Sequence, residues 1–71
     1  MILPTMTPVS SSNLYAVGYG NGDLWINFNN GTVYRYFGVP YTVYSSLMLA
    51  PSHGRFLNSY IRNVYPCQRV Q

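Results

Sequence analysis

Two Asn-Gly turns that lie nine residues apart constrain the fold of this chain more than any other feature. Asn21-Gly22 and Asn30-Gly31 interrupt runs that are rich in aromatic and β-branched residues. Asn-Gly is a strong hairpin signal because both residues tolerate positive φ angles. The runs on either side of the turns are predicted to be strands, over residues 14–19, 24–28 and 32–37. The sequence therefore predicts a three-stranded antiparallel meander.

The length of the second turn decides which side chains share a face of the sheet. A two-residue loop would place Arg35 on the core face as an unpaired buried charge. A three-residue loop, residues 29–31, places Arg35 opposite Trp25 on the other face. We expect the three-residue loop, whose core face carries Tyr15, Val17, Tyr19, Leu24, Ile26, Phe28, Tyr34 and Tyr36.

Two short helices are expected after the strands. Pro40 suits the first turn of a helix because its missing N–H would be unpaired there, and Pro51 ends this helix near Ala50. Ser52 can cap a second helix that Pro66 ends. The apolar stripe of that helix consists of Phe56, Leu57, Tyr60, Ile61 and Val64. The expected fold is α+β, a three-stranded antiparallel meander followed by two short helices packed on one face.

The 71 residues have room for one core, so we expect a single domain over residues 13–65. Residues 1–12 contain two prolines and read as an extended N-terminal arm, and residues 66–71 as a C-terminal tail. A domain of this size buries only about 60% of its unfolded surface. Charged residues make up only 7% of the chain. Small size and low charge together favour a homo-oligomer.

The sequence lacks the parts of an enzyme. General acid–base catalysis needs two titratable groups with separated pKa values, whereas this chain has one acid, Asp23, and one histidine, His53. The single Cys67 allows no intrachain disulfide, and we expect no metal site and no cofactor. The longest apolar run is far shorter than the roughly 20 residues that span a membrane. We expect a non-enzymatic protein of the cytoplasm that has no membrane contact.

The order and spacing of several short motifs resemble the KTSC domain. The resemblance covers roughly residues 9–65. Its motifs are Ser11-Ser12, Ala16-Val17-Gly18-Tyr19, Leu24-Trp25-Ile26-Asn27-Phe28, Asn30-Gly31, Tyr34-Arg35-Tyr36, Val39-Pro40, residues 50–58 and Ile61-Arg62. The family occurs at the C-terminus of some lysyl-tRNA synthetases and as free-standing small proteins of bacteria and phages, and RNA binding has been suggested for it. This chain departs from the family pattern in its low charge and in Trp25, where a polar residue is more usual.

The first candidate site is the pair Trp25 and Arg35. A guanidinium beside an indole would offer a base a stacking surface and a phosphate a charge. The alternative is that Trp25 is buried under a neighbouring chain. The RNA binding suggested for the KTSC domain would make Tyr34 and Tyr36 base-stacking residues, whereas the register makes them core residues.

The second candidate site is the start of the second helix. The first turn of this helix, Ser52-His53-Gly54-Arg55, would offer a phosphate unpaired backbone N–H groups. Ser52 would add a hydroxyl and Arg55 a guanidinium, and the small Gly54 would let the phosphate approach the backbone closely. Arg62 lies seven residues after Arg55 and is expected on the same side of the helix. Asn58 shares that polar side. The alternative is an ordinary helix cap beside a solvated face.

These features favour a binding module for a nucleotide or single-stranded nucleic acid, including RNA. One form would be a phage protein that sequesters a nucleotide signal in the host cytoplasm. The second hypothesis is a phage structural protein, or an inhibitory protein, that acts by contact with a host protein. The low charge and the eight tyrosines suit a surface that a protein partner covers.

Overall fold

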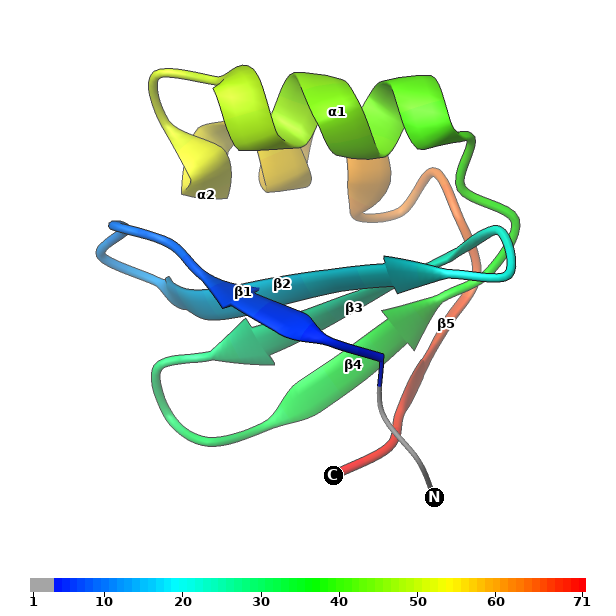
Figure 1. The fold of residues 1–71 in the computed structure, drawn as a ribbon, viewed down its shortest axis with the longest axis horizontal. Helices are drawn as coiled ribbons and strands as arrows, with labels where there is room; N and C mark the ends of the chain where they lie inside the picture. Colours follow the sequence, from blue (N-terminus) through cyan, green and yellow to red (C-terminus); the bar gives the residue numbers. More distant parts are fainter. Residues whose placement is uncertain (1–3) are drawn as a thin grey trace.

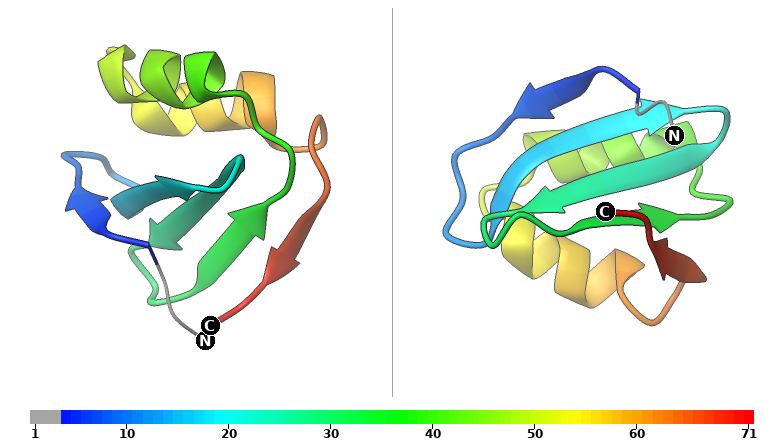
Figure 2. Two further views of the ribbon diagram at one scale, coloured as in Figure 1. Left: turned by 45° about the vertical axis from the view of Figure 1, so that its right-hand side comes forward. Right: turned by 90° about the horizontal axis from the view of Figure 1, so that it is seen from below.

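A five-stranded antiparallel sheet forms one layer of the molecule and two helices cover one of its faces (Figure 1). The computed structural model describes residues 4–71. The strands are β1 (Met6–Pro8), β2 (Leu14–Gly20), β3 (Asp23–Phe28), β4 (Val33–Tyr36) and β5 (Cys67–Arg69), in that spatial order. Figure 2 shows the sheet from the face that the helices leave open. The α+β prediction is confirmed.

The predicted count of three strands is wrong, because the sheet has five. The two additional strands come from the segments that the sequence analysis treated as an arm and a tail. β1 pairs with β2, and β5 pairs with β4. Each has only three residues, and a strand that short carries too little periodicity to be recognised in a sequence.

The predicted register of the central hairpin is confirmed. Trp25 pairs with Arg35, and the Phe28 N–H donates to the Thr32 carbonyl at 2.8 Å across a three-residue loop. Gly31 lies in that loop at φ +90°, a conformation that favours glycine. Tyr36 is therefore buried on the core face, and Tyr34 lies half-buried at its margin.

A β-bulge in β2 overturns the prediction that Tyr15 belongs to the core. Leu14 pairs with Phe28 and Ala16 with Asn27, which leaves Tyr15 as an extra residue between them. Because side chains alternate along a strand, the extra residue turns Leu14 inward and Tyr15 outward. Leu14 is 1% exposed and Tyr15 is 60% exposed.

The helical layer consists of α1 (Tyr41–Leu49), followed by the short α2 (His53–Phe56) and the π-helical segment η1 (Leu57–Ile61). Both helices pack on the same face of the sheet (Figure 1). Their buried side chains meet those of the strands in one core, which contains Leu14, Val17, Leu24, Ile26, Tyr36, Val39, Leu47, Leu57 and Ile61. Within residues 4–71, no helix has the length and apolar character that crossing a bilayer requires.

The second helix differs from the regular helix that the sequence predicts. Its last turn is π-helical, with the Arg62 N–H donating to the Leu57 carbonyl at 2.8 Å. Arg62 itself already has extended backbone angles, and Asn63 follows at φ +63°. The helix therefore ends at Ile61, several residues before Pro66. Tyr60 and Val64 of the predicted apolar stripe are exposed.

The open face of the sheet carries one continuous cross-strand row: Met6, Gly18, Trp25, Arg35 and Gln68. Gly18 has no side chain, and a Cβ there would lie only 2.5 Å from Met6 Sδ and 3.0 Å from Pro4 Cγ. The N-terminal segment therefore folds over Gly18, next to Trp25.

Candidate ligand-binding grooves

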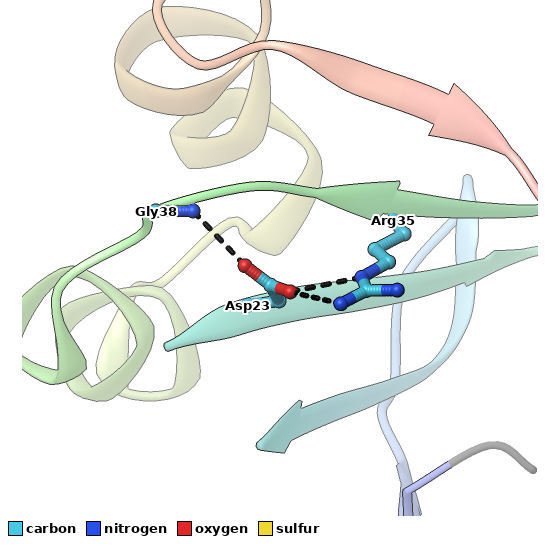
Figure 3. A network of polar contacts seen from close by, with 3 residues as sticks. All are labelled: Asp23, Arg35 and Gly38. Carbon is cyan, nitrogen blue, oxygen red and sulfur yellow. Dashed lines mark hydrogen bonds and ion pairs between the residues drawn. The ribbon is translucent and has the colours of Figure 1, made fainter. Parts of the chain in front are cut away.

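Arg35 is held by an internal ion pair on the open face of the sheet (Figure 3). Asp23 Oδ2 accepts hydrogen bonds from Arg35 Nε, at 2.9 Å, and from Nη2, while Asp23 Oδ1 accepts one from the Gly38 N–H at 3.0 Å. Burial alone would raise the pKa of the Asp23 carboxyl, but the Gly38 N–H and the Arg35 guanidinium outweigh it, and the pKa is lowered. Arg35 therefore has its counter-charge within the protein.

Trp25 does not present its ring to solvent. The indole is 5% exposed, and Nε1 has no hydrogen-bond partner within residues 4–71. The guanidinium of Arg35 lies 4.9 Å from the centroid of the indole and also 4.9 Å from that of Phe37. The predicted contact between Trp25 and Arg35 is confirmed, whereas the expectation that the pair offers an open stacking surface is wrong, because the protein itself covers the indole.

The start of the second helix serves the fold. Ser52 Oγ accepts a hydrogen bond from the Arg55 N–H at 3.3 Å, as an N-cap does. His53 Nδ1 donates to the Leu47 carbonyl at 2.8 Å, near the end of α1. Gly54 is buried, and a Cβ there would lie 3.2 Å from Asn13 Nδ2. These contacts match the alternative interpretation, in which Ser52 is an ordinary N-cap and Gly54 allows the helix to pack closely against Asn13.

The expectation that Arg55 and Arg62 share one side of a helix is wrong. Arg55 lines a shallow apolar hollow of about 300 Å³ with Pro51 and Phe56, whereas Arg62 lines two other grooves. The π-helical turn and the extended backbone at Arg62 change the angular spacing between the two residues. Arg62 is thereby directed toward the sheet side of η1.

The first of the two grooves lies between η1 and the turns at the ends of β2 and β3, and we call it the amide groove. Its volume is about 410 Å³. Its lining comprises Ser12, Asn13, Leu14, Phe28, Asn29, Asn30, Gly54, Leu57, Asn58 and Arg62. Four of these residues carry amide side chains. Of the predicted site residues, this groove brings together Gly54, Asn58 and Arg62.

The amides of this groove differ in how far the fold already uses them. Asn29 Nδ2 donates to the Ser12 carbonyl at 2.8 Å, and Asn30 Oδ1 accepts from the Thr32 hydroxyl at 2.7 Å. The side chain of Asn13 forms no hydrogen bond within the described part of the chain, and Asn58 Oδ1 accepts only a long bond of 3.5 Å from Arg62. Asn13, Asn58 and the amide nitrogen of Asn30 are therefore available to a ligand.

The second groove, which we call the tyrosine groove, lies between the end of η1 and the strands β4 and β5. Its volume is about 650 Å³. Its lining comprises Phe28, Asn30, Thr32, Tyr34, Tyr36, Arg62, Asn63, Tyr65, Pro66, Cys67 and Arg69. Arg69 pairs with Tyr34 across β4 and β5, so both side chains lie on the helix-facing side of the sheet. Burial raises the pKa of the Tyr36 hydroxyl above its ordinary value.

The sequence did not predict four residues that line the grooves: Asn13, Asn30, Tyr65 and Arg69. Asn30 was interpreted only as a turn residue. Arg69 lay in a segment that was not predicted as a strand, so no register placed it beside Tyr34. The density of asparagines around the second turn is the one signal in the sequence that marks this region.

Known proteins provide an independent comparison. The family model of the KTSC domain matches residues 10–65. A protein of Tsukamurella paurometabola is 39% identical over 59 residues, which cover 80% of this chain and 88% of that protein. The crystal structure of a KTSC domain protein from Yersinia pestis superposes with a TM-score of 0.91 at 35% identity and covers 94% of this chain and 97% of that one. The chain belongs to the KTSC domain family.

Proposed function

We propose that this protein is a non-enzymatic module that binds a nucleotide or a single-stranded nucleic acid in the amide and tyrosine grooves. The observation that carries the proposal is the position of Arg62, an exposed guanidinium that lines both grooves. The grooves replace the pair Trp25 and Arg35, and the start of the second helix, as the proposed site.

The charge distribution supports a phosphate contact at Arg62. Asp23 is the only acidic residue of the chain, and Arg35 already binds it. No acidic side chain is therefore left to neutralise Arg62 or Arg69. A guanidinium matches the geometry of a phosphate with two parallel hydrogen bonds. Arg62 lines the tyrosine groove directly after η1 and Arg69 lines it from β5, so a phosphate there can contact either or both.

The aromatic lining of the tyrosine groove supports a base contact. Phe28 and Tyr34 pack edge to face at 5.8 Å between ring centroids, and Tyr65 lines the same groove. Stacking of a base on an aromatic side chain is worth about 1–3 kcal/mol and tolerates any base. Single-stranded nucleic acids are recognised by this combination of stacking and hydrogen bonds to base edges.

The number of free cations limits the length of the ligand. Three arginines, Arg55, Arg62 and Arg69, remain exposed, and only the last two line the tyrosine groove. Proteins that bind duplexes without sequence preference commonly neutralise roughly 6–10 phosphates. A single copy of this chain is therefore suited to a nucleotide or a short single-stranded segment.

Isothermal titration with nucleoside monophosphates and a hexanucleotide tests the proposal. Arg62→Gln should weaken binding by about tenfold, which corresponds to one lost charge-assisted contact. Arg55→Gln is the matched control, since it removes the same charge from an exposed position outside both grooves. Equal affinities of the two variants, or no binding by the unmodified protein at millimolar ligand, would contradict the proposal.

A second candidate function is contact with another protein, a second copy included. The rings of Phe56 and Tyr60 pack at a tilt of 44°, with centroids 4.8 Å apart, and line the same hollow as Pro51 and Arg55. Leu49 at the end of α1 is 83% exposed. Aromatic residues with an adjacent arginine are favoured at protein interfaces. Light scattering of the protein and of Tyr60→Ser tests the homo-oligomeric form, and a monomer in both cases counts against it.

A further inference from the structure

The amide groove and the tyrosine groove are neighbours that share three lining residues, Phe28, Asn30 and Arg62. We infer that they hold two adjacent nucleotide units of one ligand, with the phosphodiester between the units at Arg62. This inference rests on the proposed function and adds the size of the ligand and a role for each groove.

The volumes of the grooves support two occupants. They are about 410 and 650 Å³, and each falls within the range of about 300–1,000 Å³ that is usual for one small ligand. A single nucleotide would fill one groove and leave the other to solvent. Because Arg62 is common to both, a phosphate that joins two nucleosides can contact it while each nucleoside occupies its own groove.

The linings of the grooves differ, and this difference gives each a separate role. The tyrosine groove presents Tyr34 and Tyr65, which are suited to stacking on a base of any identity. The amide groove presents the unengaged side chain of Asn13 and the weakly engaged side chain of Asn58. An amide can pair with a base edge through its carbonyl and its NH₂ group, and so distinguishes one base from another. We therefore assign base selection to Asn13 and Asn58.

The test compares linear dinucleoside monophosphates with the corresponding nucleoside monophosphates, by nuclear magnetic resonance on the ¹⁵N-labelled full chain. ApA carries one charge and AMP about 1.5 to 2, so tighter binding of ApA cannot come from charge. The inference expects at least tenfold tighter binding of the preferred homodinucleotide. It also expects the side-chain amide signals of Asn13 and Asn58 to shift with the dinucleotide and not with the mononucleotide.

Asn58→Ala should weaken binding of the dinucleotide by about tenfold, to near the affinity of the unmodified protein for the mononucleotide. Ser59→Ala is the control, because it is exposed and lies outside both grooves. A hexanucleotide that binds more tightly than the dinucleotide identifies a single strand as the source of the two units, and equal affinities identify a free dinucleotide. If the protein binds the mononucleotide and the dinucleotide with equal affinity, this inference is overturned and the proposed function stands. If none of these ligands binds, both the inference and the proposed function are overturned.

Discussion

The carboxylate of Asp23 binds the guanidinium of Arg35 on the open face of the sheet (Figure 3). The same guanidinium lies 4.9 Å from the ring centroids of both Trp25 and Phe37. The same carboxylate accepts the Gly38 N–H, in the segment that connects β4 to α1. One acidic side chain thus fixes a strand pair and the path by which the chain enters the helical layer. This contact accounts for the only acidic residue of the protein.

Replacement of Asp23 by Asn should destabilise the fold by roughly 1–3 kcal/mol. The substitution leaves the guanidinium of Arg35 partly buried without a counter-charge, and Arg35 is only 32% exposed in its side chain. Urea unfolding of Asp23→Asn, Arg35→Gln and the double variant measures the coupling between the two residues. The double variant should lose less than the sum of the two single losses. If the loss of the double variant equalled the sum of the two single losses, the ion pair would contribute nothing to the free energy of unfolding.

Protonation of the Asp23 carboxyl should lower the stability of this protein at acid pH. Its pKa in the folded state lies below its usual value of 3.8, because the Gly38 N–H and Arg35 outweigh the effect of burial. A lowered pKa in the folded state gives stability that is fully present above the unfolded pKa and is lost as the pH falls through the folded pKa. Thermal unfolding should therefore be insensitive to this group from pH 7 to about 5 and should lose stability below about 4. Asp23→Asn should lack that decline, and an unchanged decline would assign it to another group.

The parts of the fold that the sequence predicted were those with strong local signals. Asn-Gly turns fixed two hairpins, and the cost of burying Arg35 was enough to choose the register of the second one. The bulge at Tyr15 was not predictable, since the stretch alternates in a way that fits a regular strand equally well. Whether the last turn of a helix is α or π depends on packing of Leu57 and Ile61 in the core, which the periodicity alone does not encode.

The site was predictable only in part, for a related reason. Arg62, Asn58 and Gly54 were identified as polar or small residues on one helix, but the groove they line also needs residues from distant turns. Asn13 enters the amide groove from the segment that connects β1 to β2. Arg69 enters the tyrosine groove from β5, a strand of three residues that only tertiary pairing reveals. Trp25 was placed correctly in the register and wrongly in exposure, because the register alone does not show how far neighbouring residues bury an indole.

Gly18→Ala should detach the N-terminal strand. The added Cβ would lie 2.5 Å from Met6 Sδ and 3.2 Å from the Thr5 carbonyl oxygen, so backbone must shift as well as side chain. We expect a loss of about 1–3 kcal/mol, which lowers the melting temperature of a domain of this size by several degrees. Trp25 fluorescence should shift to longer wavelength, because Trp25 is the cross-strand neighbour of Gly18 and is buried. Gly20→Ala is the matched control, since its nearest neighbour would be Pro4 Cβ at 3.7 Å, and an equal effect of both would rule out this explanation.

Gly54→Ala should weaken ligand binding more than stability. The new Cβ would lie 3.2 Å from Asn13 Nδ2, the end of a side chain that can rotate away, while alanine improves helix propensity by about 1 kcal/mol. The free energy of unfolding should therefore change by less than about 1 kcal/mol. Displacement of Asn13 into the amide groove should lower the affinity for a dinucleotide severalfold. Unaltered affinity, with the amide signal of Asn13 shifted, would remove Asn13 from the binding surface.

The salt dependence of binding should count the arginines that contact phosphate. Each phosphate neutralised on a single strand contributes about 0.7 to the slope of log affinity against log salt. Contacts from Arg62 and Arg69 predict a slope of about −1.4 for the hexanucleotide, and Arg62→Gln should reduce it to about −0.7. Arg55→Gln should leave the slope unchanged, because Arg55 lies outside both grooves. Arg35→Gln should leave it unchanged as well, since Asp23 already neutralises that guanidinium. A slope steeper than about −3 would require phosphate contacts beyond the two grooves, and hence pooling of arginines from several copies of the chain.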